Sequence, residues 1–121
     1  MTTAAVRVRR RRATWRLGVA PLVWAAHFLA IYAFTALACA RSGTSGWFGI
    51  GAVPWFIGGV TLAAAAALLV TIGIAGRHGW RAEAVPEPAG FVRWLSAAGA
   101  GVALLAVLWE ALAVIWVPVC A

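Results

Sequence analysis

Residues 94–120 read WLSAAGAGVALLAVLWEALAVIWVPVC, a run of apolar and small residues that contains a single acid, Glu110. Such a run is long enough to cross the roughly 30 Å hydrocarbon core of a bilayer as one helix. A carboxylate at mid-bilayer costs about 2.5–3.5 kcal/mol on insertion scales, so it normally faces protein or water and has a partner. The stretch therefore predicts a membrane helix with one residue that needs another group beside it.

Two further apolar runs precede this one, and together they indicate the fold class. We expect helices over about 17–40, 54–76 and 92–117, the last ending before Pro118. Backbone groups in lipid must be satisfied within the segment, so spans of this length should be helical. Because 64% of the 121 residues are hydrophobic, an ordinary soluble domain is excluded. We predict an all-α integral membrane protein, with residues 17–121 forming a small bundle of three transmembrane helices.

Arginine distribution predicts how the bundle is oriented. Residues 1–16 form a basic arm, and the second loop, over 77–90, carries Arg77 and Arg81. The positive-inside rule puts both in the cytoplasm of a bacterium, which leaves the first loop and the C-terminus periplasmic. Next to a membrane span, the arm marks topology and contacts anionic lipid headgroups; it lacks the aromatics and module of a nucleic-acid binder. Its arginines are Arg7, Arg9, Arg10, Arg11, Arg12 and Arg16.

A cleaved signal peptide ending near Ala38–Ala40 is the competing interpretation of the first span. The apolar run there is about 23 residues, against 7–15 for the apolar core of a signal peptide. We therefore expect the span to be retained, in a multi-pass protein of the bacterial inner membrane.

The two cysteines lie at the ends of spans. Cys39 ends the first span and Cys120 ends the third, so the predicted orientation puts both at the oxidising periplasmic rim. A disulfide between them is our prediction, and two buried thiols that pack as small hydrophobes are the alternative. Two thiols alone do not complete a copper or zinc site, so no metal site is predicted.

His27 is the candidate partner of Glu110. Twelve residues separate His27 from Cys39, and ten separate Glu110 from Cys120. These separations correspond to rises of about 18 Å and 15 Å in a helix. If a disulfide holds the cysteine ends level, the imidazole and the carboxylate lie within about 3 Å of the same depth. The count matches their depths but does not set the rotation of either helix.

Small residues indicate which helix faces pack. Small residues at one face let membrane helices approach closely, and in the third span they recur on the same face as Glu110. This predicted face consists of Ser96, Gly99, Ala103, Ala106, Glu110 and Ala113, with a matching face of Gly59, Ala63 and Ala67 on the second span. On the first span, Ala20, Trp24, His27, Ile31 and Thr35 share a face. Tyr32 lies on its flank, and the deep Trp24 and Trp109 are expected to pack between helices.

Three interpretations of the His27–Glu110 pair remain open. The first is a structural hydrogen bond between helices, which averages about 0.6 kcal/mol and serves assembly specificity more than stability. The second is a proton-handling or ligand-binding pair, because a histidine beside a carboxylate titrates in the physiological range. The third makes His27 an axial haem ligand, although the sequence offers no second ligand. No cofactor is predicted; haem and copper are retained as alternatives.

The stretch from Pro21 to Cys39 resembles small bacterial membrane proteins encoded beside haem–copper cytochrome c oxidase subunits and assembly factors. The residues that carry this resemblance are Trp24, His27, Tyr32 and Cys39, with Glu110, Pro118 and Cys120 at the far end. The resemblance implies an accessory or assembly role in a respiratory oxidase, and it implies no catalytic residue.

We accordingly expect a small accessory subunit or assembly factor of a larger inner-membrane complex, first of all a respiratory terminal oxidase. Its partners would be membrane lipids and other membrane subunits or copies of itself, and not nucleic acid. No nucleophile–base set is visible, so we expect no catalysis by the chain itself. A proton-coupled transporter or proton path that uses Glu110 is the alternative, as is a haem- or copper-handling protein.

Overall fold

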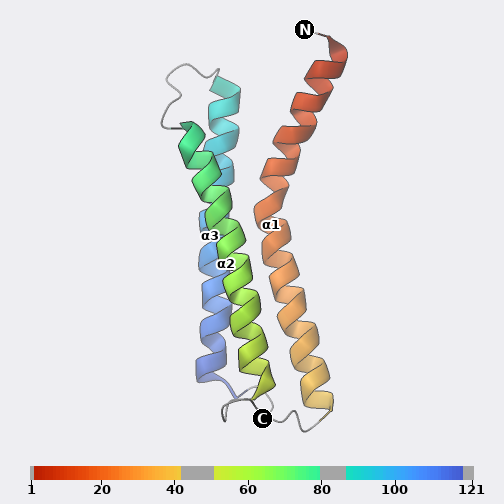
Figure 1. The fold of residues 1–121 in the computed structure, drawn as a ribbon, viewed down its shortest axis with the longest axis vertical. Helices are drawn as coiled ribbons and strands as arrows, with labels where there is room; N and C mark the ends of the chain where they lie inside the picture. The colour runs from red at the N-terminus through yellow and green to blue at the C-terminus, as the bar shows by residue number, and fades with distance from the viewer. Residues whose placement is uncertain (1, 42–50, 80–86, 119–121) are drawn as a thin grey trace.

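The computed structural model describes residues 2–41, 51–79 and 87–118, which form three long helices. These are α1 (Thr3–Ala40), α2 (Ala52–Gly79) and α3 (Glu87–Trp116). Figure 1 shows them side by side, with the end of α1, the start of α2 and the end of α3 at the same end of the bundle. The predicted all-α architecture is confirmed.

Each helix contains a segment long and apolar enough to cross a membrane. The candidate spans are Thr3–Ala40, Ala52–Arg77 and Gly90–Ala113. Length and composition therefore indicate a multi-pass membrane protein, as the sequence predicts. Most large apolar side chains of these spans point outward, which suits a protein whose solvent is lipid.

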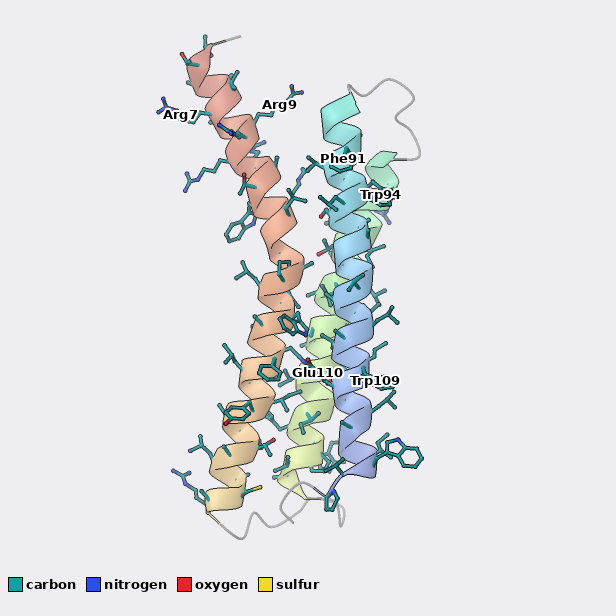
Figure 2. The ribbon with its side chains drawn as sticks, turned by 180° about the vertical axis from the view of Figure 1, so that it is seen from behind. Arg7, Arg9, Phe91, Trp94, Trp109 and Glu110 are labelled. Carbon is teal, nitrogen blue, oxygen red and sulfur yellow. The ribbon has the colours of Figure 1, made fainter. Side chains whose placement is uncertain are left out.

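Helix α1 begins well before the expected boundary at residue 17. Residues 3–16 are helical and continue directly into the apolar span, so the basic arm is part of α1. Alanine and arginine are among the best helix formers, and no glycine or proline occurs before Gly18. At 38 residues the helix is about 57 Å long, well beyond a hydrocarbon core. In Figure 1 its N-terminal part leans away from α2 and α3, and Figure 2 shows Arg7 and Arg9 there.

Two apolar clusters hold the helices together. The larger one joins all three helices and includes Leu68, Ala100 and Val107, none of which has any exposed surface. The smaller one joins α1 and α2 near the loop between them, through Ala38, Val53 and Ile57. In lipid such packing acts through van der Waals contact, so the alanines matter because they admit close approach.

Helix rotation departs from the predicted packing faces. Ser96 and Ala103 are buried and Ala106 is half-buried, as expected for a packing face, but Gly99 is exposed and its neighbour Ala100 is buried. The predicted face on α2 is wrong: Gly59, Ala63 and Ala67 are all exposed. Helix α2 packs instead through a stripe at the adjacent register, made of Val53, Ile57, Thr61, Ala64 and Leu68. The physical reason is complementarity: Leu68 packs beside the alanines of α3, and Val53 and Ile57 pack beside Ala38 of α1.

Candidate functional site: an intramembrane polar network

His27 is the centre of a hydrogen-bonded network that joins the three helices. Its residue is only 2% exposed, on the inner face of α1. Nδ1 lies 3.1 Å from Oε2 of Glu110 in α3, and Nε2 lies 3.0 Å from Oγ1 of Thr61 in α2. The structure thus brings together the imidazole and the carboxylate that the sequence pairs by depth. Both ring nitrogens of His27 have a partner.

Trp24 completes the network from the flank of α1. Its indole Nε1–H donates to Oε1 of Glu110 over 3.0 Å. Trp24 lies one turn from His27, so two residues of α1 reach the two oxygens of one carboxylate. Trp24 is 41% exposed, so it lies along the side of the bundle, and the prediction that it packs between the helices is wrong.

The network can keep its contacts in two protonation states. With one proton shared between the pair, that proton lies on Nδ1 or on Oε2, and the Nε2–H of His27 donates to Thr61. When the pair has lost one proton, the single imidazole proton lies on Nδ1 and donates to Glu110, and the Thr61 hydroxyl donates to Nε2. The hydroxyl of Thr61 serves both states because it both accepts and donates. The pair is neutral overall in the first state and carries one negative charge in the second.

Thr61 is the member of the network that sequence reasoning missed. It is 8% exposed and lies mid-helix in α2. An imidazole has two nitrogens, and a buried one needs a partner for each. Glu110 serves only one of them, and Thr61 is one of just two hydroxyl residues in the second predicted span. Counting the donors and acceptors of His27 would have pointed to it.

A groove opens beside Glu110 on the outer flank between α1 and α3. It has a volume of about 400 Å³ and is lined by Phe28, Ile31, Tyr32, Thr35, Ala36, Glu110 and Ala113. The Glu110 side chain keeps 25% of its surface exposed, whereas that of His27 keeps 1%. The carboxylate therefore forms the boundary between the buried network and the groove.

Aromatic rings form the α1 side of this flank. Trp24, Phe28 and Tyr32 follow one another at four-residue spacing, and each successive pair of ring centroids is 6.3 Å apart. Tyr32 is 67% exposed, which agrees with its predicted flanking position. Thr35 also lines the groove, and its buried Oγ1 has no hydrogen-bond partner.

The prediction that Trp109 packs between helices is wrong. It is 77% exposed, although it directly precedes Glu110 in α3 (Figure 2). Successive helical residues differ by about 100° in direction, so a residue beside an inward-facing acid points elsewhere. Trp109 therefore lies outside the network.

The other predicted residues lie toward the ends of the bundle. Ser96 donates a hydrogen bond to the backbone carbonyl of Arg16 over 3.2 Å, which ties the start of α3 to α1. Cys39 is in the last turn of α1. Cys120 lies outside the described residues, so the disulfide stays a prediction.

Comparisons with protein-family models, with curated proteins and with solved structures find no match to this chain. The chemistry of the network is therefore the basis for a functional proposal.

Proposed function

We propose that this chain is a small, non-catalytic accessory protein of the bacterial inner membrane that docks onto a larger membrane complex. The observation that supports this most directly is the lateral exposure of Glu110. One quarter of its side-chain surface faces a groove on the outside of the bundle. Docking would occur at this flank, between α1 and α3.

Exposure of this flank to lipid is energetically unfavourable, because Glu110 lies on it. A carboxyl group at membrane depth is costly unless protein or water covers it, by about 2.5–3.5 kcal/mol on insertion scales. The contacts of Glu110 with Trp24 and His27 offset part of that cost, but each carboxylate oxygen has further acceptor capacity and a quarter of the side-chain surface stays exposed. A partner helix in the groove would cover the acid, and the small Ala36 and Ala113 would let it approach closely.

The packed interior disfavours the transporter alternative for a single copy. Leu68, Ala100 and Val107 have no exposed surface and lie in a cluster contributed by all three helices. A proton path needs a chain of polar groups or water, and this layer supplies apolar side chains only. Transport through Glu110 would therefore require a pathway built with other subunits.

The haem alternative conflicts with the contacts of His27. An axial ligand offers a ring nitrogen to iron. Both nitrogens of His27 are already engaged, by Glu110 and by Thr61, and the residue is almost fully buried. Haem binding would have to break one of these hydrogen bonds and open the bundle.

A respiratory terminal oxidase is the first partner to test, on the strength of the sequence resemblance around Trp24, His27 and Tyr32. The proposed orientation has a cytoplasmic N-terminus and a periplasmic C-terminus, which the arginine distribution supports. It also puts Cys39 and Cys120 at the periplasmic rim, where mass spectrometry without reductant should find them bridged. Two free thiols in the mature protein would remove that part of the proposal.

The proposal is tested by purifying the tagged full chain from its native membranes in mild detergent. We expect oxidase subunits and haem absorbance to purify with the wild type. An Ala113→Phe variant, which fills the groove, should lose them, whereas the matched Ala63→Phe variant on the exposed face of α2 should keep them. Recovery of the wild-type chain alone, or equal losses in both variants, would contradict docking at this flank.

A further inference from the structure

We propose that the groove receives a Lys or Arg side chain from a membrane helix of a different protein. The inference rests on the proposed docking function and specifies the chemistry of the partner. Three of the residues that line the groove support the inference: Glu110 with its carboxylate, Tyr32 with its aromatic ring, and Thr35, whose buried hydroxyl has no hydrogen-bond partner.

The carboxylate supplies the negative end of the site. Oε1 accepts from Trp24 and Oε2 contacts His27, so each oxygen retains an acceptor position. An ammonium or guanidinium group in the groove would favour the state of the network that has one proton fewer, because the pair then carries one negative charge. In that state Nδ1–H still donates to Glu110 and the Thr61 hydroxyl donates to Nε2. The incoming cation therefore replaces a proton, and no buried hydrogen bond is lost.

The aromatic residues Phe28 and Tyr32 and the hydroxyl of Thr35 offer further favourable contacts to a cationic side chain. Aromatic faces attract cations that lie within about 6 Å of the ring centroid, and more strongly where water is excluded. Phe28 and Tyr32 line the groove, 47% and 67% exposed. Thr35 also lines the groove, and its buried hydroxyl oxygen has no hydrogen-bond partner, so its capacity as an acceptor is unused.

A second copy of this chain cannot provide the cation. The sequence contains no lysine, and none of its arginines falls within 17–40, 54–76 or 94–120. The arginines that the structure describes lie at 7–16, 41, 77 and 93, toward helix ends. Its one mid-span base, His27, is buried and already paired. The partner is therefore a different protein that has a basic residue in the middle of a membrane helix. That basic residue in turn needs an acid beside it, because a charge at membrane depth is costly.

The test reconstitutes the full chain in phosphatidylcholine vesicles with a Leu/Ala transmembrane peptide of about 24 residues that carries one central Lys. The matched peptide has Met at that position. Energy transfer between a dye on the chain and a dye on the peptide reports binding. We expect the Lys peptide to bind the wild type about thirtyfold more tightly than the Met peptide.

Glu110→Gln should remove that preference, because glutamine keeps an acceptor for Trp24 and a contact for His27 but loses the charge. Circular dichroism verifies that the variant folds, and Ala63→Phe serves as the unaffected control. Equal binding of the two peptides by the wild type, or an unchanged preference in Glu110→Gln, would overturn the inference. Dodecylammonium is the competitor: Glu110-dependent binding of this free amine without any Lys-peptide preference would overturn the choice of a helix-borne cation.

Native purification separates this inference from the proposed function. If the complex is lost in Ala113→Phe but unchanged in Glu110→Gln, docking stands and the cationic contact is wrong. If both variants retain the complex, the docking proposal itself fails.

Discussion

All three helices contribute to an apolar layer, called here the dry layer, and to the hydrogen-bonded network, called here the polar layer. The two layers perform different tasks. The dry layer is the larger apolar cluster, in which Leu68, Ala100 and Val107 are wholly buried and Ala20 contributes from α1. The polar layer consists of His27, Thr61 and Glu110, whose hydrogen bonds span all three helices. Apolar packing in lipid permits many helix rotations, whereas paired polar groups select one. The polar layer alone also reaches the outer surface, through Glu110.

The largest stability effect should come from the dry layer. Leu68→Ala removes a fully buried side chain, and we expect a loss of about 2–5 kcal/mol in the free energy of unfolding. Unfolding in bicelles measures it. The native complex should still form while the variant is folded, because Leu68 is not among the residues that line the groove. Loss of the complex by a folded variant would show that the two layers are not separate.

The polar layer should show the next largest effect, together with a loss of docking. His27→Leu leaves Glu110 with only the indole of Trp24 as a partner and leaves Thr61 without the imidazole. We expect a loss of about 2–3 kcal/mol, the scale of an unpaired acid in a membrane. The same bicelle assay applies, with Leu68→Ala as the packing control. An unchanged free energy of unfolding would mean that the network does not specify the bundle.

Trp24→Phe should have a smaller effect on the free energy of unfolding, because it removes a single hydrogen bond. The substitution removes the Nε1–H that donates to Oε1 of Glu110 and keeps an aromatic ring on the flank. We expect a loss of about 0.6 kcal/mol, the average for a hydrogen bond between membrane helices. Trp109→Phe is the matched control, since that exposed tryptophan lies outside the network. Equal losses in the two variants would contradict the role given to Trp24.

Gly59→Ala should have the smallest effect and no penalty. An added Cβ would meet nothing within 4 Å, and glycine is the weaker helix former. We expect the free energy of unfolding to stay the same or rise by up to about 1 kcal/mol. A clear loss in the free energy of unfolding would mean that the Gly59 face of α2 is a packing surface, as the sequence alone predicts.

The sequence predicts the elements of this fold better than their rotation. Long apolar runs fix the number and type of helices because a bilayer leaves the backbone no alternative. The scarcity of polar residues in those runs also pairs His27 with Glu110. Which face of α2 packs depends on how Ile57 fits against α1 and how Leu68 fits against α3, and the spacing of small residues along the sequence does not reveal that fit. The rotation of α2 misplaces Gly59, and the rotation of α3 misplaces Gly99 and Trp109 in the same way. Thr61 was missed because its role follows from the second nitrogen of His27.

Solid-state NMR in native-lipid vesicles tests the central claim most directly, because the chain has only two histidines and three acids. Label the histidines with ¹⁵N and the glutamates with ¹³Cδ, and replace His78 by Gln so that His27 alone reports. The account predicts dipolar coupling between the imidazole Nδ1 and the Glu110 carboxyl carbon, because Nδ1 and Oε2 are 3.1 Å apart. Absence of that coupling in a folded sample would contradict the network and every proposal built on it.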